Sequence, residues 1–415
     1  MKFRDMPYER VDYDRAEREI RALTDRVEDA KSPEEVWEVH QEYYRVYRDV
    51  ADAMTIAHIR YDADVTDEFY QKEREYYDEI DPKLSNLMTA YQRAIYESPY
   101  RPYLEEKIGK VAFVSIENAM KSVDESIIGL MQEENALKTE YNRLIASAQI
   151  PFDGQVLNLS LMRPYLTASD RGVRREAWKA YSGYFQSVAQ KLDDLYDRLV
   201  KNRTAQAKAL GYENYIQLGY YRMNRNSYGR KDVENFRRQV KEVFVPLAEE
   251  VHEKRRRRLG LGKLSYIDNE VYFPQGNPDP VGTPEEILKT GQRMYGELSE
   301  ETREFFDFMM ENELFDVFGR KTKKQGGYMT YLYNYGSPFI FANFNGTSGD
   351  VDVITHECGH AFQGYLSGKD PVLEHSDITM ETAEIHSMSM EFFTDPWMKD
   401  FFGERAQDFL ALQLE

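Results

Sequence analysis

Two histidines spaced four residues apart place the strongest condition on the fold of this chain. They lie in the segment His356-Glu357-Cys358-Gly359-His360. On an α-helix, residues four apart project from one face about one turn apart, so both imidazoles can reach one Zn²⁺ at about 2.0–2.1 Å. Glu357 lies near the same face and can reach a zinc-bound water without binding the metal. The segment therefore predicts a zinc-binding helix.

The residues around this segment also predict a helix. An apolar set within residues 351–354 precedes the two histidines, and Gly368 stands where the helix is expected to end. Gly359 would allow another helix to pack closely at this point. Cys358 lies on nearly the opposite side from the first histidine, and we interpret it as a core residue.

A catalytic zinc usually has three protein ligands and one open position, so a second element has to supply another ligand. Residues 379–391 offer three carboxylates on one helical face, at Glu381, Glu384 and Glu391. Around a cation such a group is expected to act as a ligand and its hydrogen-bonding partners. A solvated acidic face is the alternative, but the apolar residues of this segment predict a buried helix: Ile385, Met388, Met390, Phe392 and Phe393.

Most of the remaining chain is predicted to be helical. Ser32-Pro33-Glu34-Glu35 and Thr283-Pro284-Glu285-Glu286 each combine a capping hydroxyl, a first-turn proline and a glutamate three residues after the cap. Only 15 prolines and 24 glycines among 415 residues leave room for long helices. One helical face near the N-terminus is marked by apolar residues three and four apart: Ala16, Ile20, Leu23 and Val27.

Turn-forming residues near 150–154 interrupt this helical pattern. We take this break as the boundary between an N-terminal helical lobe, residues 1–150, and a second region, residues 151–415. In the second region, the alternating, aromatic-rich residues 328–335 predict a strand, and residues 339–344 predict another. The expected fold class is therefore mainly α, with a small β-sheet beside the zinc-binding helix.

The composition excludes several classes of protein. Hydrophobic residues make up 41% of the chain, which is too many for a disordered protein. A formal net charge of −19 argues against nucleic acid or an anionic membrane as the main partner. A single cysteine allows no intrachain disulfide, and no apolar run could span a bilayer, so we expect a cytoplasmic protein.

In residues 356–360 and 379–391 the chain resembles the thimet oligopeptidase and oligoendopeptidase F family of zinc metallopeptidases, closest to the oligoendopeptidase F-like branch. The family pattern is a His-Glu-x-Gly-His helix, then a glutamate about 25 residues later, with serine three and glutamate seven residues after it. Glu384, Ser387 and Glu391 match the second part of that pattern. The specific match covers roughly residues 320–395.

The resemblance implies that His356, His360 and Glu384 bind one Zn²⁺ per chain and that Glu357 is the general base. It also implies two helical lobes around a deep channel that admits short unstructured peptides. A small sheet in that channel would pair with the substrate backbone, and we expect residues 339–344 to form its exposed edge. The residues expected to contact substrate are Gly327, Tyr328, Phe341, Ala342 and Asn343, and those expected to support the zinc ligands are Glu381 and Glu391.

Three functions remain open at this level. The leading expectation is a zinc-dependent endopeptidase for short peptides; the alternatives are a helical zinc carboxypeptidase and a non-catalytic peptide-binding protein. In the family, a histidine and several tyrosines that hold substrate lie in a region that would follow Glu415, so we expect the chain to be a fragment. The sequence leaves the oligomeric state open.

Overall fold

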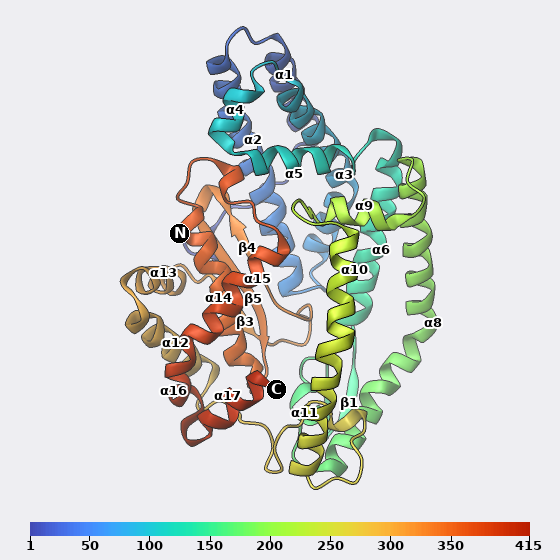
Figure 1. Cartoon of the computed structure of the whole chain (residues 1–415), viewed down its shortest axis with the longest axis vertical. Helices are drawn as coiled ribbons and strands as arrows, with labels where there is room; N and C mark the ends of the chain where they lie inside the picture. Colours follow the sequence, from blue (N-terminus) through green and yellow to red (C-terminus); the bar gives the residue numbers. More distant parts are fainter.

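The computed structural model describes residues 1–415, the whole chain, and it is mainly helical. Figure 1 shows α1–α5 at the top, a small sheet with α12–α17 at the left, and α6 with α8–α11 at the right. The helices of the first half are α1 (Tyr13–Asp29), α2 (Pro33–Ala63), α3 (Glu68–Glu97), α4 (Arg101–Ile108), α5 (Lys110–Met120), α6 (Ile128–Ala146), α7 (Arg163–Leu166) and α8 (Arg171–Ala209).

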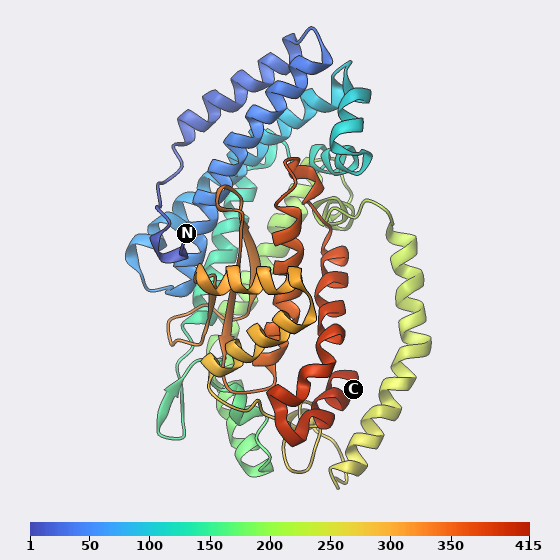
Figure 2. The same ribbon diagram turned by 90° about the vertical axis from the view of Figure 1, so that its left-hand side faces the viewer.

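The helices of the second half are α9 (Tyr215–Arg222), α10 (Arg230–Gln239), α11 (Val245–Arg258), α12 (Pro284–Leu298), α13 (Glu300–Glu311), α14 (Gly349–Ser367), α15 (Met380–Thr394), α16 (Met398–Phe402) and α17 (Ala406–Leu414). A π-helical turn, Val240–Phe244, joins α10 to α11 and accommodates Pro246, which has no N–H to donate. The result is one long helix, which stands apart from the rest of the fold in Figure 2. Almost all of its side chains are exposed.

The predicted helix starts are confirmed. Ser32 caps α2, where its Oγ accepts a hydrogen bond from the Glu35 N–H at 3.2 Å, and Pro33 is the first helical residue. Thr283 caps α12 with a capping box that includes Glu286. The four apolar residues predicted to share a face of α1 are all buried. None of the helices combines the length and apolar composition needed to cross a membrane.

Two small sheets break the helical pattern. The break predicted near residues 150–154 is a hairpin of β1 (Ile150–Phe152) and β2 (Gln155–Leu157), with Asp153 and Gly154 both at positive φ in its turn. The second sheet contains β3 (Phe315–Phe318), β4 (Tyr328–Leu332) and β5 (Ser337–Phe344) in the order β3-β5-β4. Sequence analysis predicted β4 and β5 and missed β3.

The expectation that residues 339–344 form the exposed edge is wrong, because β5 is the central strand. It pairs with β3 in parallel and with β4 in antiparallel fashion, so both of its sides are already hydrogen-bonded. Seven of its eight residues are buried. The free edge next to helix α14 belongs instead to β4.

The apolar residues gather in several clusters. The largest contains 28 buried residues from the three-stranded sheet, α12–α17 and two side chains of α2, Ile56 and Ile59. A second cluster of 16 buried residues joins α1–α5. Helix α14 crosses the sheet within the first cluster, so the sheet and its covering helices hold the predicted zinc-binding helix in place.

Candidate metal centre and active site

Helix α14 presents His356, Glu357 and His360 on the side away from the core. Its opposite side packs into the largest apolar cluster, where Cys358 is fully buried, as predicted. The start of the helix is fixed by Asp350, whose carboxylate accepts backbone hydrogen bonds from the two preceding loop residues at 2.9 and 2.8 Å. The helix ends at Ser367, directly before the glycine predicted to stop it.

Helix α15 packs directly against α14, and Gly359 makes this approach possible. A Cβ atom at Gly359 would lie 2.6 Å from Ser387 Cα and 2.8 Å from the His386 carbonyl oxygen, both on α15. Such distances are shorter than atoms tolerate, so the backbones could not come this close with any other residue. The contact places Glu384 of α15 opposite the two histidines of α14.

We therefore predict that Gly359→Ala pushes the two helices apart and lowers the free energy of unfolding by about 1–3 kcal/mol, the usual cost of overpacking. The matched control is Gly183→Ala in α8, where an added Cβ meets no atom within 4 Å. Alanine there should stabilise the helix by about 1 kcal/mol. Urea unfolding of both variants measures the difference, and equal midpoints would contradict this account of Gly359.

Three side chains converge on one point. The Glu384 Oε2 atom lies 3.3 Å from His356 Nε2 and 3.8 Å from His360 Nε2, and one ligand atom from each residue lies within 4.8 Å of the others. Zinc at about 2.0–2.2 Å from two nitrogens and one oxygen requires similar separations. Two imidazoles and one carboxylate, with room for a fourth ligand, fit a catalytic zinc site.

Neighbouring side chains hold two of these three in position. His356 Nδ1 lies 2.6 Å from Glu391 Oε1, so it can donate to that carboxylate and leave Nε2 free to bind a metal. Ser387 donates a hydrogen bond of 3.0 Å to Glu384 Oε2. Glu381 does not join this cluster: its carboxylate accepts a hydrogen bond from Tyr228. The expected supporting role is therefore not seen for Glu381.

Comparison with known proteins identifies the family at this point. A family model for the peptidase M3 N-terminal domain matches residues 3–123, and the model for peptidase family M3 matches residues 165–280 and 297–413, which together exceed half of the chain. The chain belongs to peptidase family M3. Within the family it falls in the oligoendopeptidase F-like branch, in agreement with the resemblance found from the motif residues.

Three similar M3 proteins illustrate this relationship. The solved structure of PZ peptidase A with an inhibitor is 43% identical, with a TM-score of 0.98, and is covered for 74% of its length by the whole chain. The oligoendopeptidase F homolog of Borreliella burgdorferi is 22% identical over 85% of this chain and 62% of that protein. Oligopeptidase PepF of Bacillus subtilis is 23% identical over 87% and 56%. The chain thus spans little more than half the length of these two curated relatives.

The M3 family implies zinc, and the donor atoms of His356, His360 and Glu384 fit that metal. The electrostatic setting is consistent with this assignment. Burial, with the charge of His356 beside it, lowers the pKa of His360, so that its imidazole is neutral and able to bind a metal at neutral pH. Burial also raises the pKa of Glu357, and the nearby Glu384 adds to that effect. A carboxylate with a raised pKa is a better proton acceptor.

A cavity of about 440 Å³ lies between this cluster and β4. Gly327 and Tyr328, two of the expected substrate contacts, line it together with Glu357 and the three candidate ligands. The other expected contacts do not: Phe341 and Ala342 are fully buried in the core. Asn343 donates hydrogen bonds to the carbonyl oxygens of residues 324 and 326 and lies outside this cavity. Sequence analysis missed the other lining residues, among them Met329, Tyr331, Gln363 and Asp377.

The backbone of β4 offers unpaired hydrogen-bonding groups beside this cavity. Tyr331 pairs with Pro338 of β5, and because proline has no N–H, that pair cannot exchange the two hydrogen bonds of a bonded pair. In an antiparallel ladder the bonded and non-bonded pairs alternate, so Tyr331 and Met329 direct their N–H and C=O groups away from β5. The free edge of β4 can therefore accept another extended strand.

Proposed function

We propose that this M3 chain is a zinc-dependent endopeptidase that hydrolyses short, unstructured peptides. The observation that carries the proposal is the convergence of His356, His360 and Glu384 beside Glu357, in a cavity bounded by a strand with a free edge. Zinc bound there would act as a Lewis acid and lower the pKa of a bound water. Residues of the chain carry out the other two tasks, which are binding the peptide and transferring the proton.

The free edge of β4 positions the substrate. An extended peptide can pair with the N–H and C=O groups of Met329 and Tyr331 by adding a strand to the sheet. Main-chain pairing of this kind does not depend on the substrate sequence. It requires an unfolded segment, since a folded domain has no free extended strand to offer.

Glu357 acts as the general base in this mechanism. Its carboxylate accepts the proton of the attacking water as the peptide carbonyl is attacked, and then gives that proton to the leaving amine. The raised pKa of Glu357 favours the first transfer. Glu391 and Ser387 keep His356 and Glu384 in fixed orientations while the proton moves.

We infer that two helical lobes, residues 1–150 and 151–415, flank a channel that leads the peptide to this site. The separate apolar cluster formed by α1–α5 supports this division. A carboxypeptidase would need a basic residue to bind the substrate C-terminus. No lysine or arginine lines the cavity at the metal cluster, which favours internal cleavage.

Cleavage of a blocked peptide tests the proposal. A quenched fluorescent peptide of ten residues, acetylated and amidated at its ends, should be cut internally by the zinc-loaded protein. Removal of zinc with a chelator should abolish cleavage, and added zinc should restore it. Removal of residues only from an unblocked C-terminus would instead indicate a carboxypeptidase. Stoichiometric zinc without any turnover would contradict the proposed activity.

A further inference from the structure

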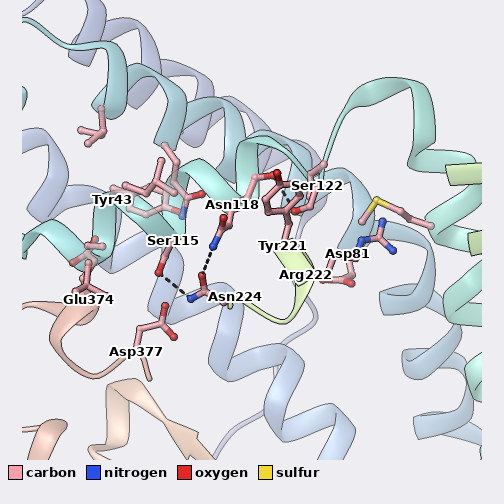
Figure 3. A pocket seen from close by; sticks show the side chains of 18 of the residues that line it. Tyr43, Asp81, Ser115, Asn118, Ser122, Tyr221, Arg222, Asn224, Glu374 and Asp377 are labelled. Atoms are coloured by element: carbon pink, nitrogen blue, oxygen red, sulfur yellow. Dashed lines mark hydrogen bonds between the residues drawn. The ribbon is translucent and has the colours of Figure 1, made fainter. Parts of the chain in front are cut away.

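A second cavity, of about 520 Å³, is drawn in Figure 3. It lies among α2, α3, α5, α6 and α9 and reaches the segment between α14 and α15. Asp377, in that segment, lines both cavities. A peptide bound in the cavity at the metal cluster would therefore have Asp377 in the wall around it.

Several polar side chains in the wall of the second cavity already make hydrogen bonds to one another. Asn224 accepts a hydrogen bond of 3.0 Å from Asn118 Nδ2 and donates one of 2.9 Å to Ser115 Oγ (Figure 3). These bonds tie the end of α9 to α5. They leave the amide of Asn224 in a fixed orientation, so this part of the wall is rigid.

Most charged groups of the second cavity are also paired. Glu374 accepts from Tyr44 and lies 2.9 Å from His40 Nε2. Glu134 lies 3.2 Å from Arg222 Nη1, in a buried ion pair. These groups therefore have partners without any ligand.

Two further charged groups of this cavity lie close to opposite or polar partners. Burial raises the pKa of Asp78 and of Asp81, and the nearby charge of Lys138 opposes that rise. The same charge helps to lower the pKa of Glu134. Asp81 also accepts a hydrogen bond of 3.3 Å from Asn135. Their charges are largely balanced inside the protein.

Asp377 is the exception. Its carboxylate makes no hydrogen bond or ion pair, and Figure 3 shows it pointing into the cavity below Ser115 and Asn224. Asp377 is an exposed residue, so its carboxylate is open to solvent and to a ligand. Partial burial and the charge of Glu374 raise the pKa of Asp377, and no neighbouring cation opposes that shift. At the metal cluster the other two carboxylates of the lining already have roles, in metal binding and in proton transfer.

We propose that Asp377 is a specificity-determining residue that binds a cationic group, an ammonium or a guanidinium, of the peptide paired with β4. The inference rests on the proposed function, because it assumes that a peptide occupies the cavity at the metal cluster. A cation would supply the partner that the Asp377 carboxylate lacks within the protein. An anionic side chain at the same position would face Asp377 and Glu374 and would be repelled.

The test measures binding rather than turnover, so that it does not depend on catalysis. The probes are labelled ten-residue peptides, blocked at both ends and neutral apart from the residue under test. Each carries one lysine, or one glutamine as the neutral counterpart, and the position of that residue changes from peptide to peptide. Binding to the zinc-loaded Glu357→Gln protein is followed by fluorescence anisotropy. One further peptide carries a free N-terminal ammonium in place of the acetyl group. Lysine at one position, or the free ammonium, should tighten binding by about ten-fold.

Variants at Asp377 then identify the partner. Asp377→Asn should remove the preference and change the affinity for the neutral peptide by less than about two-fold, while Asp377→Lys should favour glutamate over lysine at that position. Asp193→Asn, an exposed carboxylate of α8 outside both cavities, is the control for loss of one negative charge and should leave the preference unchanged.

Two results would overturn the proposal. One is a cationic preference that persists in Asp377→Asn, and the other is the absence of any tighter binding by a cationic peptide. Cleavage of the neutral blocked peptide by the unmodified protein tests the proposed function separately. If no cationic peptide bound more tightly while the neutral blocked peptide was still cleaved, only the role of Asp377 would be rejected.

Discussion

Replacing Glu357 by glutamine is expected to reduce peptide hydrolysis by about 10²–10⁴-fold while zinc binding persists. Glutamine keeps the size and planar shape of the side chain, but its amide cannot accept a proton from water. Glu357 contributes no atom to the cluster of candidate ligands, so the metal should remain. The loss should fall on kcat, measured with the quenched peptide at saturating concentration, with zinc content measured on the same sample.

The control for this substitution is Glu304→Gln, an exposed glutamate of α13. It removes the same charge far from the cavity and should retain full activity. Activity retained in Glu357→Gln would show that another group is the base. Loss of zinc from that variant would show that Glu357 helps to hold the metal, and the proposed division of roles would then fail.

Helix α14 was predictable because its signals are local. A histidine pair four residues apart, an apolar set before it and a glycine after it all lie within one element, and each depends only on helical periodicity. The same is true of the caps at Ser32 and Thr283, where a hydroxyl and a glutamate three residues later interact within one turn. Long-range packing did not have to be known for any of these.

The order of strands in the sheet was not predictable in the same way, because it depends on contacts between distant segments. β3 lies more than ten residues before β4, and its four residues gave no alternating pattern. One signal did exist in β5: an uninterrupted apolar run such as Phe339-Ile340-Phe341-Ala342 is typical of a strand buried on both faces, hence a central one. An exposed edge strand would instead alternate.

The burial of helix α15 was predicted wrongly. Its apolar composition predicted a buried helix, yet Ile385 and Phe393 are each 63% exposed, and only Ser387, Met390 and Thr394 are buried. Composition reports how many apolar residues a helix contains, whereas burial depends on which face meets a neighbour. The two helices meet where two small residues face each other, Gly359 on α14 and Ser387 on α15, and composition does not single these residues out.

Asp377 could not be recognised from the sequence, since nothing in its neighbourhood forms a motif. It becomes a candidate only because the fold places it between two cavities and pairs the other charged groups around it. The same holds for Tyr331, whose outward backbone groups follow from the position of Pro338 in the adjacent strand. Residues that contact substrate through the fold rather than through a motif require the structure.

Glu384→Ala is expected to lose zinc more severely than any change to the surrounding residues. Its carboxylate is the only oxygen donor in the three-residue cluster, and the two histidines alone leave the metal with two protein ligands. Partners that merely orient ligands typically contribute 10–100-fold to metal affinity, so Glu391→Gln should fall within about that range and Glu384→Ala should exceed it. Competition with a chromophoric chelator at pH 7 measures the zinc affinity of the unmodified protein and of each variant.

The decisive comparison is with Glu381→Ala, which removes a carboxylate from the same helix only one turn away. Glu381 bonds to Tyr228 and lies 3.5 Å from Arg225 Nε, so its loss should leave the zinc affinity unchanged. If Glu381→Ala lost zinc while Glu384→Ala retained it, the assignment of the third ligand would be wrong. The graded order Glu384, Glu391, Glu381 tests the geometry of the site independently of catalysis, because each substitution removes one carboxylate of α15 that stands in a different relation to the two imidazoles.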